Sequence, residues 1–151
     1  MSRNQIMNKI SLRKTCLSDS KFLYELLQER DSKSFITHKK LPTFKNHEQF
    51  VKSFPYSKWY IIILNNEKAG SVSITDQNEI GIWVLKKFQN MGIGGNALKL
   101  LIKNHPKSRY LANINPKNKE SVEFFGKHNF KLIQHTFELK NNETKKNNQV
   151  I

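Results

Sequence analysis

Closely spaced glycines beside a strand-like run carry the clearest chemistry in this sequence. Gly92, Gly94 and Gly95 stand between the apolar run 79–85 and a segment whose apolar residues recur at helical spacing. Glycines let a loop turn successive backbone N–H groups inward, and the following helix adds its unpaired N-terminal donors and the positive end of its dipole. Such a segment favours a phosphate or pyrophosphate. The alternative is that these glycines only permit a tight helix start.

Two familiar phosphate-binding motifs are excluded by the residues around these glycines. A P-loop requires Lys-Ser/Thr after its last glycine, whereas Gly95 is followed by Asn96 and Ala97. The dinucleotide fingerprint requires a third glycine three residues after Gly94, and that position is Ala97. The segment also follows a predicted meander rather than the first strand of a βαβ unit. A different phosphate-binding fold is therefore indicated.

Apolar periodicity predicts the elements that position this segment. Strands are expected at 10–13, 59–64, 70–74 and 79–85, and short polar turns join the last three into an antiparallel meander. Helices are expected after Ser18, from Asn46, after the glycines and after Asn118. The helix from Asn46 should bury Phe50, Val51 and Phe54. Further strands are expected at 110–114, 130–134 and 137–139.

This order of elements predicts an α/β (α+β) fold with a mixed, mostly antiparallel central sheet and helices on both faces. A single domain is expected over residues 1–139. The polar, Asn- and Lys-rich segment 140–151 contains no apolar period, and we expect it to be a disordered tail.

Composition limits the compartment and the partners of this protein. Cys16 is the single cysteine, so an internal disulfide and a multi-cysteine metal site are excluded, and no metal is expected. The sequence shows no signal peptide and no membrane span, which predicts a cytoplasmic protein without a membrane partner. The net charge is +14, but only Arg3, Arg13, Arg30 and Arg109 contribute arginine to 26 basic residues. Since arginine is preferred for bidentate phosphate and base recognition, a nucleic-acid partner is not favoured.

Two separated motifs resemble the GNAT superfamily of acetyltransferases. Gln89, Gly92 and Gly94 match its signature Gln/Arg-x-x-Gly-x-Gly/Ala. Downstream, Asn118-x-x-Ser121-Val122-x-Phe124-Phe125, followed by Asn129-Phe130, is similar to the family's Asn-x-x-Ala/Ser-x-x-Leu-Tyr … Gly-Phe block. The resemblance covers about residues 10–139, and the order and spacing of the two motifs make it more specific than either motif alone.

The resemblance implies that acetyl-CoA is the cosubstrate and assigns residues to its parts. Backbone groups of the strand before the loop would contact the pantetheine arm, and backbone amides of the glycine segment would hold the pyrophosphate. Asn118 and Ser121 would face the cofactor, although Asn118 also fits a plain helix N-cap. The residues implied are Trp83, Val84 and Leu85 for the arm, with Gln89, Met91, Gly92, Ile93, Gly94, Gly95 and Asn96 for the loop.

One departure from the family concerns its usual proton donor. Phe125 occupies the position at which the family often has a tyrosine that protonates the departing thiolate. Phenylalanine cannot donate a proton, so Phe125 would only lie beside the cofactor, with water or Ser121 as a substitute acid. A thiolate whose pKa is near the cysteine value of about 8.5 is already a tolerable leaving group, so the departure need not abolish activity.

Acetyl transfer to an amine also requires a base, because an ammonium has no lone pair and alkyl amines are mostly protonated at neutral pH. Glu79 is the best candidate, since alternation places it on the same strand face as Gly81 and Trp83. A solvated carboxylate beside a turn is the competing interpretation. His38 and His47 are weaker candidates, because isolated histidines in polar segments are usually exposed.

The resemblance also suggests an acceptor. Leu12-Arg13 and the later segment 46–50 look like the branch that acetylates nucleotide-linked amino sugars, or like the related ribosomal-protein N-acetyltransferases. We expect a small-molecule amine, with an amino-sugar nucleotide first, a protein N-terminus second, and a homodimer as the assembly. The rival from another class is a non-catalytic CoA-binding or RNA-binding module that reuses the fold.

Overall fold

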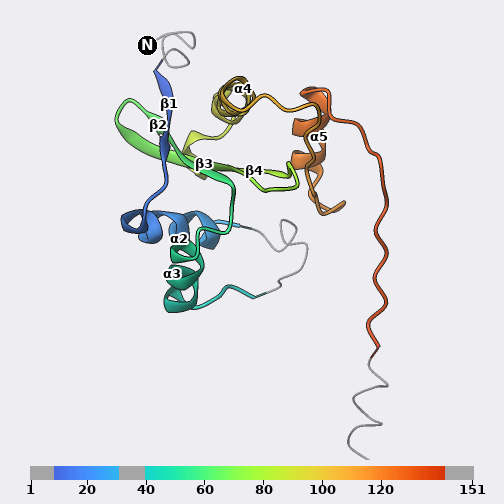
Figure 1. Ribbon diagram of the computed structural model, residues 1–151, viewed down its shortest axis with the longest axis horizontal. Helices are drawn as coiled ribbons and strands as arrows, with labels where there is room; N and C mark the ends of the chain where they lie inside the picture. Colours follow the sequence, from blue (N-terminus) through green and yellow to red (C-terminus); the bar gives the residue numbers. More distant parts are fainter. Residues whose placement is uncertain (1–8, 31–39, 142–151) are drawn as a thin grey trace, which may run out of the picture.

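The computed structural model describes residues 9–30 and 40–141 and shows one antiparallel sheet with helices on both of its faces (Figure 1). The strands are β1 (Ile10–Lys14), β2 (Lys58–Leu64), β3 (Glu67–Ile74) and β4 (Ile80–Val84), and they are neighbours in that order. The helices are α2 (Ser20–Gln28), α3 (Phe44–Lys52), α4 (Ile93–Asn104) and α5 (Lys119–Lys127). Short 3₁₀ helices occupy Leu17–Asp19 (η1) and Lys86–Phe88 (η3). Within the described ranges, no helix has the length and apolarity to cross a membrane.

A tight hairpin organises the centre of the sheet. Asn65 and Asn66, between β2 and β3, have φ values of 50° and 67°. Positive φ at both central residues matches the twist of the flanking strands, and asparagine tolerates it better than most residues. The predicted meander of β2, β3 and β4 is confirmed.

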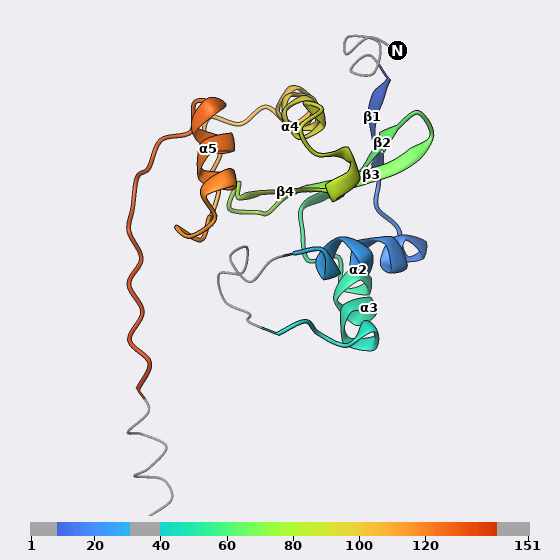
Figure 2. The ribbon, with the colours of Figure 1, turned by 180° about the vertical axis from the view of Figure 1, so that it is seen from behind.

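The two faces of the sheet are covered by different helices, as both views show (Figures 1 and 2). Along β2, alternate residues point to opposite faces. Ile62 packs toward α4, where Ala97 and Leu101 are fully buried. Ile61 packs toward α2 and α3 in a smaller cluster that includes Leu23, Leu26, Val51 and Leu85. The sheet, β4 included, therefore has one face covered by α4, called the α4 side, and an opposite face covered by α2 and α3, called the α2–α3 side.

A buried carboxylate fixes the start of α2 against the sheet. Asp19 receives a two-pronged contact from Arg13 at 2.8 and 3.1 Å, and its Oδ1 lies 2.8 Å from Lys68 Nζ. The backbone N–H of Cys16 also donates to Asp19 at 2.9 Å. Burial alone would raise the pKa of Asp19, but these hydrogen bonds outweigh burial and hold that pKa well below its ordinary value. The carboxylate thereby joins β1, β3 and α2.

Helix α3 begins earlier and buries less than the sequence predicts. Thr43 is its N-cap, and Thr43 Oγ1 accepts a hydrogen bond from the backbone N–H of Asn46 at 3.2 Å. Val51 is buried as expected, whereas Phe50 and Phe54 are 43% and 57% exposed. The predicted burial of these two phenylalanines is wrong. Phe50 lies outside the stripe that α3 turns toward α2 and the sheet, and Phe54 lies beyond the end of the helix, where its φ is 48°.

The start of α2 also differs from the prediction. Ser18 lies inside η1, and Asp19 is the residue that precedes α2, without a side-chain capping bond. The carboxylate of Asp19 is instead occupied by Arg13, Lys68 and Cys16, so tertiary contacts replace the cap.

The strands predicted after α4 are wrong. In the 110–114 segment only Leu111 pairs, through an isolated parallel bridge to Glu79. The segments 130–134 and 137–139 form no strand, and the chain after Phe130 runs away from the sheet (Figure 1). Phe137 and Leu139 are both 92% exposed. Alternating apolar residues predict strand propensity, but a strand also needs a partner for its backbone groups, and beyond the bridge at Leu111 none of the described strands supplies one. Most of the predicted tail, 142–151, lies outside the described residues.

Candidate active site

The glycine segment forms a loop that ends in an uncapped helix N-terminus. Asn90 and Gly92 have φ values of 64° and 76°, and Gly92 is the N-cap residue of α4 in the left-handed conformation. The first helical bond runs from the N–H of Asn96 to the carbonyl of Gly92 at 3.1 Å, and the Asn96 side chain donates to the same oxygen at 2.8 Å. The N–H groups of Ile93, Gly94 and Gly95 precede that bond, so they lack an acceptor within the helix. This arrangement fits a diphosphate.

The strand that leads into this loop has an open edge. Leu85 donates its N–H to Ala69 of β3 at 2.9 Å, while Ile80 donates on the other side, to Leu111 at 2.7 Å. Alternation in an antiparallel ladder then turns the backbone groups of Ile82 and Val84 away from β3. Beyond Leu111, no described strand pairs with this edge. Gln89 Nε2 donates to the carbonyl of Val84 at 3.0 Å, which ties the loop to the strand.

The hydrogen bonds of β4 show which of the backbone groups predicted for the pantetheine arm face the open edge. Of Trp83, Val84 and Leu85, only Val84 presents its backbone to the open edge, because the N–H of Leu85 is used within the sheet. Ile82 shares that edge and is absent from the predicted set. The alternation of hydrogen-bonding direction along β4 is the signal that could have found it.

The two sequence motifs meet at the first turn of α4. A Cβ atom on Gly94 would lie 3.4 Å from Cε2 of Phe124, and one on Gly95 would lie 3.0 Å from the His128 ring. Both partners belong to α5 or its C-terminal cap. The glycines therefore allow α5 to approach the helix terminus, in addition to freeing the backbone for a ligand.

The downstream motif is partly structural. Asn118 Oδ1 accepts a hydrogen bond from the N–H of Ser121 at 3.3 Å, so the predicted N-cap role is confirmed. Phe125 is 8% exposed, and its ring centroid lies 5.1 Å from that of Phe124 and 5.0 Å from that of Phe130. Asn129, which stands where the family block has glycine, has a φ of 70°, a conformation that asparagine tolerates best after glycine. Phe125 thus packs between two phenylalanine rings, and its own side chain cannot donate a proton.

Glu79 stands at the opposite end of β4 from the glycine loop. Its N–H donates to Thr75 Oγ1 at 3.0 Å, and its carboxylate accepts a hydrogen bond from the side-chain amide of Asn113. Glu79 is half-buried, so its carboxylate is held in place without being sealed from solvent. By alternation it shares the α2–α3 side of the sheet with Gly81 and Trp83.

His47 and His38 are the weaker candidates for the catalytic base. His47 is buried between α2 and α3, which corrects the expectation that it is exposed. Burial, together with the positive charge of Arg30, lowers the pKa of His47, so its ring is neutral at pH 7. Its Nε2 has no hydrogen-bond partner, and its ring packs beside Tyr24 and Phe50. His38 lies outside the described residues.

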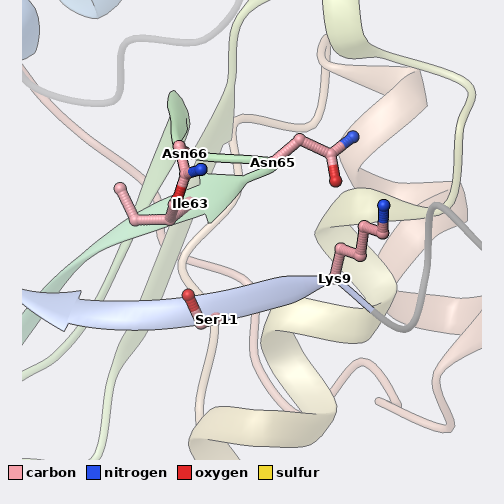
Figure 3. A pocket seen from close by; sticks show the side chains of 5 residues that line it. All are labelled: Lys9, Ser11, Ile63, Asn65 and Asn66. Atoms are coloured by element: carbon pink, nitrogen blue, oxygen red, sulfur yellow. The ribbon is translucent and has the colours of Figure 1, made fainter.

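A hollow elsewhere on the molecule is unrelated to these groups. It has a volume of about 500 Å³ and is lined by Lys9 and Ser11 on one side and by Ile63, Asn65 and Asn66 on the other (Figure 3). These residues belong to β1, the residue before it and the β2–β3 hairpin, at the edge of the sheet opposite β4. The hollow is open, and no carboxylate or imidazole is among the residues that line it.

Comparison with solved structures finds the same fold in several proteins. A domain from Methanocaldococcus jannaschii is 26% identical, with a TM-score of 0.74 over 86% of this chain and 93% of that one. An acetyltransferase from Thermus thermophilus is 17% identical, with a TM-score of 0.70 over 83% and 89%. The ribosomal L7/L12 alpha-N-protein acetyltransferase RimL, in complex with coenzyme A, is 21% identical, with a TM-score of 0.67 over 85% and 84%.

At the level of sequence, no curated protein matches the chain. The model of the acetyltransferase (GNAT) family, by contrast, matches residues 21–130, a range that contains the open edge of β4, the glycine loop and the whole downstream motif. The chain therefore belongs to the GNAT family of acetyltransferases, and it is an acetyl-CoA-dependent N-acetyltransferase.

Proposed function

We propose that this enzyme acetylates a small primary amine and that acetyl-CoA lies along β4 and the first turn of α4. The observation that carries the proposal is the continuity of the open edge at Ile82 and Val84 with the free N–H groups of Ile93, Gly94 and Gly95. The edge matches the amide groups of a pantetheine arm, and the helix terminus matches a diphosphate. Asn118 and Ser121 lie on α5, which packs against that terminus.

The proposed role of Glu79 is to take a proton from the acceptor amine, directly or through a water molecule. The neutral nitrogen then attacks the thioester carbonyl carbon, a C–N bond forms, and the C–S bond breaks with release of the thiolate. The nitrogen loses its second proton in this step, and that proton passes through water or Ser121 to the thiolate. Asn113 orients the Glu79 carboxylate through its side-chain amide. Since Phe125 lies among aromatic rings and carries no acidic proton, water or Ser121 protonates the thiolate.

The acceptor proposed first is a nucleotide-linked amino sugar, on the basis of the sequence resemblance. A protein N-terminus is the second candidate, because a protein of similar fold, RimL, acetylates the N-terminus of ribosomal protein L7/L12. The net charge of +14 suits an anionic acceptor and the cosubstrate equally.

Thermal unfolding with and without acetyl-CoA tests the proposed position of the cosubstrate. Acetyl-CoA at a hundredfold excess over its dissociation constant should stabilise the protein by about 2.7 kcal/mol. A short single-stranded RNA is the polyanion control, and stabilisation by the RNA but not by acetyl-CoA would contradict the proposed cofactor site.

Release of CoA thiol then identifies the acceptor class. An amino-sugar nucleotide and a tetrapeptide with a free N-terminus are the two substrates, each with an N-acetylated copy as the control. Acetyl-CoA binding without turnover of either class would refute the proposed acceptors while leaving the cofactor site intact.

A further inference from the structure

An arginine stands directly over the sheet face that Glu79 shares. Cζ of Arg30, the residue after the C-cap of α2, lies 4.8 Å from the centroid of the Trp83 ring. Its position is fixed by neighbouring bonds, because Glu29 Oε1 accepts from the N–H of Lys86 at 2.8 Å and the N–H of Arg30 donates to Leu27 at 3.1 Å. The end of α2 is thus tied to the end of β4.

The charge of Arg30 is not neutralised by any described residue. The ion pairs in the described chain involve Arg13, Lys68 and Lys140, and the adjacent carboxylate of Glu29 is engaged with Lys86. The ionisable groups closest in influence are Tyr56 and His47, and both are neutral at pH 7 because burial raises the pKa of the phenol and lowers that of the imidazole. Neighbouring side chains partly desolvate the guanidinium of Arg30 and lower its pKa, but the residue as a whole is exposed, so an anion from solvent can reach it.

The surface beneath and beside Arg30 is aromatic with a few hydroxyl groups. Trp59 Nε1 donates to Ser71 Oγ at 2.8 Å, and the Tyr56 ring packs edge-on against Trp59 at 4.9 Å. Gly81 is exposed, and a Cβ on it would lie 3.2 Å from Ser73 Oγ, so the sheet is bare at that point.

Beneath this surface, the Trp83 indole carries a polar group without a partner. Its Nε1 is buried without a hydrogen-bond partner, and such a donor in a folded protein calls for an explanation. Aromatic side chains with a few polar groups and one cation are the residue types that commonly line a small-molecule site.

We propose that the acceptor amine carries an anionic group, a phosphate or a carboxylate, which binds Arg30 while the rest of the acceptor covers Trp83 and Gly81. The inference rests on the proposed function, because Glu79 on the same face marks the position at which the amine reacts. Glu79 and Trp83 are four residues apart along an extended strand, about 13 Å. Several bonds must therefore separate the amine from the anion, which disfavours a free α-amino acid.

Fluorescence of Trp83 tests the proposal without requiring turnover. The chain has two tryptophans, so a Trp59→Phe background leaves Trp83 as the only indole reporter. The protein is saturated with CoA to occupy the glycine loop. Two matched pairs of probes are titrated: glucosamine 6-phosphate with glucosamine, and the peptide amide Ser-Glu-Ala with Ser-Gln-Ala. We expect the anionic member of one pair to change Trp83 emission, and that pair identifies phosphate or carboxylate as the group bound.

Substitutions of Arg30 complete the test. Arg30→Met should weaken binding of the anionic probe at least tenfold, Arg30→Lys should weaken it less, and neither should affect the uncharged probe. Arg109→Met removes one charge from an exposed site after α4 and serves as the control. Equal binding of the charged and uncharged members of both pairs overturns the proposal, as does an Arg30→Met protein that is less stable but keeps its preference for the anion.

Melting and binding measurements on the same proteins distinguish a failure of the proposed function from a failure of the proposed role of Arg30. An absent melting shift with acetyl-CoA would refute the proposed function. A normal shift, combined with Arg30→Met binding that equals the wild type, would refute only the role of Arg30.

Discussion

The two ends of β4 recognise their ligands by different means. At the glycine loop, the available groups are backbone amides of Ile93, Gly94 and Gly95, and no charged side chain is needed to form the site. On the α2–α3 side, the available groups are side chains, with Arg30 over Trp83 and Glu79 farther along the strand. A backbone site requires small residues at fixed spacing, whereas a side-chain site requires residues that come together from distant parts of the chain.

This difference explains why the two ends should respond differently to mutation. Replacing one side chain can remove the base or the proposed anion contact outright. Replacing one residue of the loop leaves its amides in place, so an introduced charge is needed to oppose the ligand. Four predictions follow this contrast from the larger effect to the smaller one.

The largest effect is expected for Glu79→Gln. Turnover should fall by about a hundredfold at neutral pH, because the amide cannot take the proton of the acceptor ammonium. Affinity for acetyl-CoA should be unchanged, since the loop lies at the other end of β4. The rate deficit should shrink as pH rises and the amine loses its proton to solvent. A deficit that is equal at every pH would assign Glu79 a positioning role, and Glu67→Gln, on the exposed start of β3, is the control.

Asp19→Asn should lower the free energy of unfolding by about 2 kcal/mol, because charge-assisted hydrogen bonds to Arg13, Lys68 and Cys16 are weakened. Because its folded-state pKa is depressed, Asp19 stabilises the fold above its unfolded value near 3.8, and that stability is lost as pH falls below it. Denaturant unfolding at several pH values checks this. Asp76→Asn, at an exposed position, should have little effect, and a similar loss in both variants would contradict the prediction.

Gly94→Asp should weaken acetyl-CoA binding at least tenfold, about 1.4 kcal/mol, with little loss of stability. The carboxylate suits the helix N-terminus but repels a diphosphate there. The new Cβ meets Phe124 at an ordinary contact distance of 3.4 Å, whereas a branched residue would press on α5. Gly126→Asp is the matched control, because a Cβ there meets nothing within 4 Å. Calorimetric affinities that fall equally in both variants would argue against the loop as the diphosphate site.

The smallest effect concerns pH and His47. Burial and the charge of Arg30 lower the pKa of His47 in the folded protein below its ordinary value of 6.5. The unfolded chain therefore binds this proton more tightly than the folded protein does. Stability from His47 is therefore complete above that value and declines as pH falls through it. His105 and His128 also have lowered pKa values, so only part of the slope belongs to His47. His47→Gln should make stability less dependent on pH between 7 and 5, and an unchanged slope would contradict this.

Much of the fold could be predicted from the sequence because its signals are local. The turn chemistry of Asn65 and Asn66, the period of β2 and the cap at Asn118 each depend on a few adjacent residues. Family membership followed from glycines whose spacing is dictated by the backbone. The predicted strands at 130–134 and 137–139 failed, since propensity does not supply a pairing edge.

The side-chain end of the site was less accessible to prediction. Arg30, the Glu29 contact with Lys86 and the buried His47 depend on how α2 and α3 pack over β4, and no sequence spacing records that packing. Trp59 and Trp83 were visible in the predicted strands, but only the register, which brings Trp59 opposite Ser73 and Trp83 opposite Ser71, places them on one surface.

The strand order of the sheet has a consequence for folding kinetics. The strands are adjacent in space in the order in which they are synthesised, and short turns connect β2, β3 and β4. Closing such short loops costs little entropy, so these hairpins should assemble rapidly. The contact of Gly94 with Phe124 requires a longer closure and should come later. During refolding, the tryptophans of β2 and β4 should therefore report an early collapse, and competence to bind acetyl-CoA should appear only when α5 has docked.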